Sequence, residues 1–194
     1  MNGRIVFLLE EPSMKVLLQG LLPRLFPGWI ESEHFLCIPH EGKSDLDKSI
    51  ATKLKAWRIP GDRFVIVRDN DNAHCIDLKA RLREICITNG RPDTLVRLVC
   101  QELESWYLGD LKALALVFNQ RLDIPALRKR FADPDICQKP SNELKRFIPA
   151  FQKITAARLM AQQLSETSNL SRSFNVFITG LKKIATHSKI KYAD

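Results

Sequence analysis

RFVIVRDNDN, residues 63–72, is an apolar and β-branched run that ends in two aspartates, Asp69 and Asp71. Its length and composition predict a buried strand. A buried strand that carries carboxylates at its C-terminal tip places them where open α/β sheets bind their ligands. Two carboxylates at one such tip indicate a site for a divalent cation.

Similar apolar runs lie on both sides of this stretch and alternate with helical patterns. Strands are predicted at 4–9, 35–39 and 94–100, and amphipathic helices at 12–23, at 46–54 with Ser44 as a candidate cap, and at 76–85. Strands and helices that alternate in this way form parallel sheets covered by helices. We therefore expect an α/β fold with a Rossmann-like, mostly parallel sheet of about four strands.

The pattern changes near residue 111. Short helices are predicted at 111–118, 126–131, 142–151, 156–164 and 171–184, and prolines separate several of them. Residues 1–110 carry 15 Lys and Arg against 16 Asp and Glu, whereas residues 111–194 carry 15 against 6. We expect an α/β domain at 1–110 and a basic helical region at 111–194 packed on it. The positive charge suits either a polyanion-binding surface or a solvated helical surface.

Acidic residues follow three of the four predicted strands. They are Glu10 and Glu11, Asp69 and Asp71, and Glu102 and Glu104. The C-terminal ends of parallel strands share one edge of a sheet, so these acids should converge there. Crowded carboxylates raise one another's pKa unless a cation lies among them. Mg²⁺ prefers oxygen ligands of this kind and promotes phosphodiester chemistry.

Each acidic segment also has a structural explanation. Asp-Asn-Asp-Asn suits a turn, Glu10 suits the start of a helix, and Glu102 and Glu104 could be solvated charges. The histidines have no metal-ligand spacing and are expected at surface or turn positions, with His74 the nearest to the acids. Trp106 and Tyr107 are expected to pack at a strand-to-helix junction, with base stacking as the alternative role. EGKS at 41–44 lacks the earlier glycine of a phosphate-binding loop.

Two global properties restrict the class of protein. The five cysteines include no CxxC pair, which argues against a disulfide framework and a structural zinc site. The first apolar run spans only Ile5 to Leu9 and precedes two acids, so it fits neither a signal peptide nor a membrane span. A cytoplasmic protein without a membrane partner is expected.

LLEEPSM, VIVRDNDN and ELESWYLGD together resemble the metal-binding motifs of TOPRIM domains, which occur in topoisomerases, primases and several nucleases. Over nearly its full length the chain is also similar to a bacterial family known as domain of unknown function 4276. PGDRFVIVRDND, GRPDTLVRLVCQELESWYLGD and SRSFNVFITGLKKI carry that second resemblance. It implies a TOPRIM-like fold.

The resemblance also implies roles for individual residues. Glu10 would be a metal ligand or general acid/base, Asp69 and Asp71 would hold Mg²⁺ or Mn²⁺, and Glu104, or else Glu102, would complete the site. Glu11 stands where TOPRIM proteins usually have glycine, and Met14 replaces a second acid of the nuclease motif. Relatives of this type often accompany ABC-like or AAA-type ATPases, which implies an ATPase partner and a role in defence or DNA processing.

Three functions follow as expectations. The first is a Mg²⁺-dependent nuclease or phosphoesterase that acts on nucleic acid, with catalytic residues Glu10, Asp69, Asp71 and Glu104 and phosphate contacts from Arg68, Lys43, Arg128, Lys129 and Arg130. The second is a non-catalytic subunit that binds nucleic acid or an ATPase, which the Glu11 and Met14 departures favour. The third, a phosphotransfer receiver, lacks the lysine expected after a fifth strand.

Overall fold

A computed structural model describes residues 3–187, with the side chain of His187 left out. Four strands form one parallel sheet in the order β2-β1-β3-β4. Their bounds are β1 (Ile5–Leu9), β2 (Phe35–Pro39), β3 (Arg63–Asp69) and β4 (Leu95–Val99). The predicted α/β fold class is therefore confirmed.

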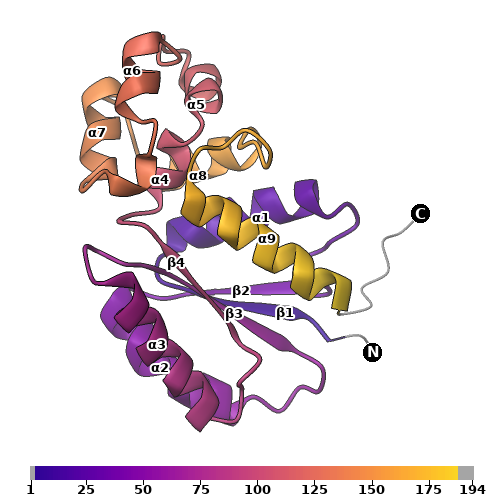
Figure 1. Cartoon of the computed structure of the whole chain (residues 1–194). Coiled ribbons are helices and arrows are strands. Elements are labelled where there is room, and N and C mark those ends of the chain that lie inside the picture. The colour runs from indigo at the N-terminus through magenta and orange to yellow at the C-terminus, as the bar shows by residue number, and fades with distance from the viewer. Residues whose placement is uncertain (1–2, 188–194) are drawn as a thin grey trace.

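Helices cover both faces of the sheet (Figure 1). Helices α2 (Lys43–Ala56) and α3 (Cys75–Thr88) cover one face, and α1 (Pro12–Leu25) and α9 (Arg172–His187) cover the other. The side chains of β1 divide between the faces: Val6 and Leu8 join the core under α2 and α3, whereas Phe7 packs with α1 and α9. This two-sided burial explains why the strand sequences are continuously apolar.

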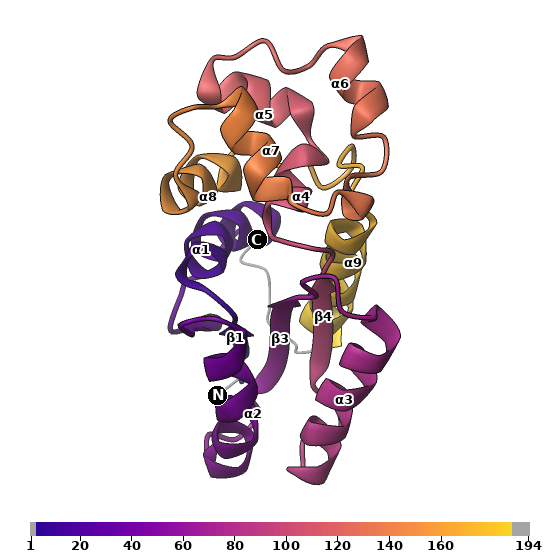
Figure 2. The ribbon, with the colours of Figure 1, turned by 90° about the vertical axis from the view of Figure 1, so that its left-hand side faces the viewer.

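The remaining helices lie beyond the C-terminal ends of the strands (Figure 2). They are α4 (Glu104–Leu108), α5 (Leu111–Phe118), α6 (Pro125–Arg130), the 3₁₀ turn η1 (Pro134–Ile136), α7 (Pro140–Phe147) and α8 (Lys153–Ala161). Leu114 of α5 and Met160 of α8 belong to the same hydrophobic cluster as Phe7 of the sheet. One core therefore extends across the predicted boundary at residue 110.

Several predicted helix ends were wrong, and three of the differences lie at a proline or a glycine. Helix α7 ends at Phe147 rather than at residue 151, because Ile148 precedes a proline and such residues avoid helical backbone angles. Gly42, not Ser44, is the N-cap of α2, with a φ of 105° that favours glycine. Helix α1 continues past Pro23 to Leu25, although the proline lacks the N–H that would bond to Gln19.

The first helix and α8 approach closely through a small residue. A Cβ added to Gly20 would lie 2.7 Å from the Cβ of Ala161. This contact positions α8, whose first residue is Lys153, over the C-terminal edge of the sheet. No helix within residues 3–187 is both long and apolar enough to span a bilayer.

Candidate functional site

Asp69 is the last residue of β3, and its carboxylate is buried at the C-terminal edge of the sheet. The residue is only 5% exposed, and its Oδ1 has no hydrogen-bond partner among the described residues. Burial raises the pKa of Asp69 well above its usual value, and the charges of Glu10, Glu11 and Glu104 raise it further. These four acids are called the acid cluster below.

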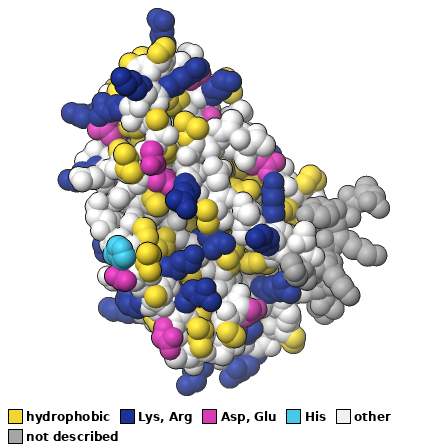
Figure 3. Space-filling view, in the orientation of Figure 1, with side chains coloured by type: hydrophobic (Ala, Val, Ile, Leu, Met, Phe, Trp, Pro, Cys, Tyr) yellow, Lys and Arg dark blue, Asp and Glu magenta, His cyan; other side chains and the backbone are white. Residues whose placement is uncertain are grey.

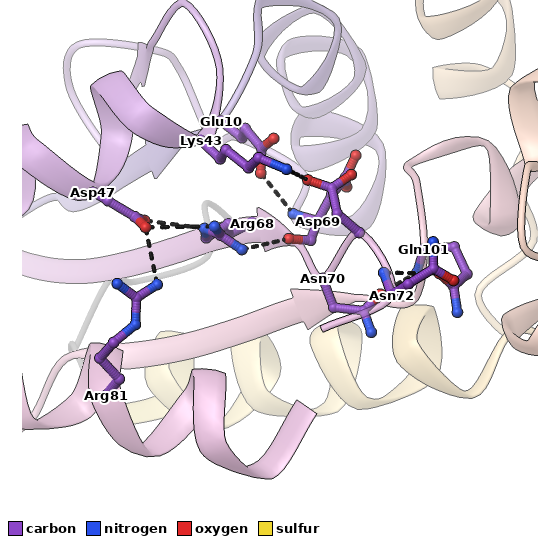
Figure 4. A network of polar contacts seen from close by, with 10 residues as sticks. Glu10, Lys43, Asp47, Arg68, Asp69, Asn70, Asn72, Arg81 and Gln101 are labelled. Atoms are coloured by element: carbon purple, nitrogen blue, oxygen red, sulfur yellow. Dashed lines mark hydrogen bonds and ion pairs between the residues drawn. The ribbon is translucent and has the colours of Figure 1, made fainter. Parts of the chain in front are cut away.

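Glu10 follows β1 and is joined directly to β3. Its Oε2 accepts a hydrogen bond of 2.9 Å from the backbone N–H of Asp69 (Figure 4). Burial raises the pKa of Glu10 to about 7, although the hydrogen bond from Asp69 opposes that shift. At neutral pH this carboxyl group can therefore either hold or release a proton.

Glu104 begins α4 and is 1% exposed. Its Oε2 is buried with no hydrogen-bond partner among the described residues, and burial raises its pKa to about 7. The Tyr107 hydroxyl, one turn later, is also buried without a described partner, and its pKa is raised by burial and by the charges of Glu104, Glu11 and Asp69. Trp106 and Tyr107 lie in the hydrophobic core, which confirms the predicted packing, and Tyr107 is also close enough to the acid cluster to feel its charges.

A lysine from the helical region supplies a positive charge to the cluster. The Nζ of Lys153, at the start of α8, lies 3.0 Å from Glu11 Oε2 and 3.8 Å from Glu104 Oε1. Its charge also lowers the pKa of Asp69, against the effect of burial. Lys153 was not predicted, whereas Glu11 was among the acids expected to converge at the strand ends. No local pattern marks Lys153, while the Glu10-Glu11 pair was a signal for Glu11.

Asp71 and Glu102 take part in other contacts. Asp71 has a left-handed φ of 47°, and its Oδ2 pairs with Lys43 Nζ at 2.8 Å on the partly exposed rim of the site. Glu102 Oε2 accepts a hydrogen bond of 2.8 Å from the backbone N–H of Ser141, in the first turn of α7. The structure thus gathers Glu10, Asp69 and Glu104, while Asp71 pairs with Lys43 and Glu102 with the Ser141 N–H. Both remain close to the cluster: the charge of Asp71 adds to burial in raising the pKa of Glu10, and the charge of Glu102 adds to burial in raising that of Glu104.

The positive residues predicted to bind nucleic acid occupy different surroundings. Arg68 is 5% exposed; its guanidinium pairs with Asp47 at 3.0 Å and donates to the Asp69 carbonyl, so it joins β3 to α2 rather than facing a polyanion (Figure 4). Arg128 pairs with Asp123, and Arg130 with Glu143, each at 2.6 Å. Lys129 lies exposed between them.

Two histidines near the site also differ in their environment. His40 is 3% exposed, with Nδ1 2.8 Å from the Leu9 carbonyl and Nε2 2.6 Å from the Ser49 hydroxyl. The surface or turn position expected for it was therefore wrong, because it fills the space after β2 beside the end of β1. His74 is exposed and pairs with Asp77. The side chain of His187 lies outside the described residues.

The donor chemistry of the acid cluster fits a hard divalent cation. Two buried carboxylate oxygens, Asp69 Oδ1 and Glu104 Oε2, lack a partner, and oxygen ligands are those that Mg²⁺ prefers. Among residues 3–187, however, no three His, Cys, Asp or Glu side chains are arranged to hold a metal ion. Side-chain rotation would therefore have to accompany metal binding.

A family model matches residues 9–182, which include the whole acid cluster and Lys153. The chain belongs to the family described as Domain of unknown function (DUF4276). A solved structure, the C-terminal region of the OLD protein of Xanthomonas campestris pv. campestris, is similar to this DUF4276 chain over 95% of it and 98% of the other chain. The two share 16% sequence identity, with a TM-score of 0.47. No curated protein matches the chain.

Proposed function

We propose that this DUF4276 protein is a metal-dependent phosphoesterase or nuclease that acts on nucleic acid, with Glu10, Asp69 and Glu104 as the ligands of Mg²⁺ or Mn²⁺. The observation that carries the proposal is the buried Asp69 carboxylate, whose Oδ1 has no described partner while two further buried acids lie nearby. Buried acids with strongly raised pKa values are costly to the fold and are concentrated at functional sites.

The location of the acids agrees with this chemistry. They follow β1 and β3 and begin α4, at the edge of a parallel sheet where ligands usually bind. A divalent cation there would polarise a phosphoryl oxygen and lower the pKa of a bound water. In the metal-free protein burial raises the pKa of Glu10 and of Glu104 to about 7, so whichever of these carboxyl groups is not bound to the metal can accept or donate a proton at neutral pH.

Cleavage of labelled DNA and RNA by the purified protein, in the presence of Mg²⁺, Mn²⁺ or a chelator, tests the proposal. We expect metal-dependent cleavage that falls by a factor of about 10² or more in Asp69→Asn and in Glu10→Gln. Asp77→Asn is the matched control, because Asp77 is an exposed aspartate whose described ion pair is with His74. Cleavage that survives in both cluster variants would refute the proposal.

A second candidate is a non-catalytic subunit that binds its partner through the same fold. It is favoured by the Lys153 ammonium group, which already balances part of the negative charge of Glu11 and Glu104. Under this alternative, calorimetric titration detects no Mn²⁺ binding and no nucleic acid is cleaved with either metal. An ABC-like or AAA-type ATPase partner remains a prediction that only the family resemblance supports.

A further inference from the structure

A groove crosses the edge of the sheet at β4, away from the acid cluster residues. Its walls come from α3 and α9, and its floor from β4; lining residues include Ile76, Lys79, Arg97, Arg172 and Val176. Because α3 covers one face of the sheet and α9 the other, a groove lined by both must pass over the β4 edge. Its two adjoining parts have volumes of about 460 and 350 Å³. This feature is called the edge groove.

The edge groove is unusual in how much aliphatic surface it leaves in water. Ile76 is 72% exposed, Leu170 54% and Val176 44%, and all three line it. Exposed apolar side chains that gather in one place mark sites of protein contact more often than isolated ones do. Figure 3 shows hydrophobic and basic side chains intermixed on this face.

The Arg97 side chain occupies the space left by the missing side chain of Gly180 in α9. A Cβ added to Gly180 of α9 would lie 2.2 Å from Arg97 Nη2 and 2.8 Å from Nε. Glycine inside a helix costs about 1 kcal/mol relative to alanine, so its presence here is explained by the space that the guanidinium needs. This packing against Gly180 keeps the positive charge of Arg97 beside the β4 edge.

Among residues 3–187, Lys79, Arg97 and Arg172 of the edge groove form no ion pair with an acid. Arg97 donates to the Val96 carbonyl at 3.1 Å, while its Nε is buried with no hydrogen-bond partner in the described part of the chain. Burial lowers the pKa of Arg97. Burial also lowers the pKa of Lys79, and the nearby charges of Arg97 and Arg83 lower it further. Asp135 is the acid that lines the groove among residues 3–187; its carboxylate is fixed by hydrogen bonds from Ser171 and Ser173 and supplies one negative charge against Lys79, Arg97 and Arg172.

We propose that the edge groove binds an acidic segment of a partner protein, in which carboxylates meet Arg97 and Arg172 and aliphatic side chains cover Ile76 and Val176. Arginine is enriched at protein interfaces, whose buried centres are more apolar than the rest of the surface, and paired guanidinium and carboxylate groups supply specificity. Single-stranded nucleic acid is the less suitable occupant, because none of the described lining residues is an aromatic on which an unpaired base could stack.

A labelled ten-residue peptide in which Glu and Leu alternate is the probe, and fluorescence anisotropy measures its affinity for the full chain. We expect the peptide to bind and Arg97→Ala to weaken binding about tenfold, which is the loss of roughly one charge-assisted contact. Arg58→Ala is the matched control and should leave affinity within about twofold, since Arg58 is exposed after α2 and donates to the Lys55 carbonyl.

Gly180→Ala tests the geometry without a change of charge. The new methyl group displaces the end of the flexible Arg97 side chain, so we expect affinity to fall several-fold while the thermal midpoint is kept or raised by the better helix propensity. Asp69→Asn should bind the peptide as the natural chain does, which separates this inference from the proposed metal site.

Three results would overturn the inference. The first is that the natural chain does not bind the peptide, and the second is that Arg97→Ala binds it with equal affinity. The third is a combination: a peptide in which Ser replaces every Leu binds equally well, and a twenty-nucleotide single strand displaces the probe fully. The last result would assign the groove to polyanions in general.

Discussion

At the scale of single residues, the acid cluster is a set of charges that the fold holds out of water. Desolvation and mutual repulsion both disfavour ionisation of Asp69, and its Oδ1 gains no hydrogen bond from the described residues in return. Such an arrangement is unfavourable for the folded state at a pH where the group is forced to ionise.

Asp69→Asn should therefore stabilise the metal-free protein. At pH 8 we expect the free energy of unfolding to rise by about 1–3 kcal/mol, because an uncharged amide replaces a buried and repelled carboxylate. Urea denaturation with a chelator present measures this. A loss of stability would mean that the carboxylate has an attractive partner in the folded state.

Lys153→Met should have the opposite effect. It removes the ammonium group that lies 3.0 Å from Glu11 and 3.8 Å from Glu104. We expect a loss of about 1–2 kcal/mol at pH 8 without metal, discounted because the lysine is 42% exposed. Lys145→Met, an exposed lysine of α7, is the control. Equal losses in the two variants would exclude an electrostatic role for Lys153.

At the scale of elements, Glu102 belongs to the start of α7. Its carboxylate accepts from the Ser141 N–H, which is one of the backbone donors that a helix leaves unpaired in its first turn. Glu102→Ala should cost about 1 kcal/mol of stability and leave Mn²⁺ affinity within about twofold. Thermal melts and calorimetry measure the two quantities. A large loss of metal affinity would return Glu102 to the candidate ligands.

The contact between α1 and α8 depends on Gly20. Alanine has the better helix propensity by about 1 kcal/mol, but its methyl group would lie 2.7 Å from the Cβ of Ala161. We expect overpacking to prevail, so that Gly20→Ala destabilises the protein by about 1–2 kcal/mol in chemical denaturation. Stabilisation would show that α8, and with it Lys153, shifts easily relative to the sheet.

At the scale of the whole molecule, stability should depend on pH through Glu10 and Glu104. Folding raises both pKa values from about 4.5 to about 7, so between these values the folded state binds more protons than the unfolded state. Stability from these groups is present at about pH 4.5, falls as pH rises, and is lost above about pH 7. Each unit of pKa corresponds to about 1.4 kcal/mol.

Metal should reverse this trend, because a cation binds the deprotonated carboxylates. We expect Mg²⁺ or Mn²⁺ to raise the thermal midpoint more at pH 8 than at pH 5.5, and this difference to disappear in Asp69→Asn. Differential scanning calorimetry at the two pH values measures it. A metal effect that is the same at both values would argue against binding at the acid cluster.

Local sequence patterns determined the four strands, their alternation with helices and the position of Glu10 and Asp69 at strand ends. A strand such as 63–69 can be predicted from its own residues, without knowledge of distant contacts, because burial on both faces requires an almost unbroken apolar sequence. The all-parallel sheet then follows from the alternation.

Tertiary structure alone decided which charges face one another. Lys153 meets Glu11 across 142 positions of sequence, Asp71 turns to Lys43, and Glu102 reaches the start of α7. Each of these pairings depends on how α2, α7 and α8 are placed around the strand ends. The spacing of apolar residues indicates which side of a helix or strand is buried. The partner of a charged side chain depends instead on packing between segments that are remote in the chain.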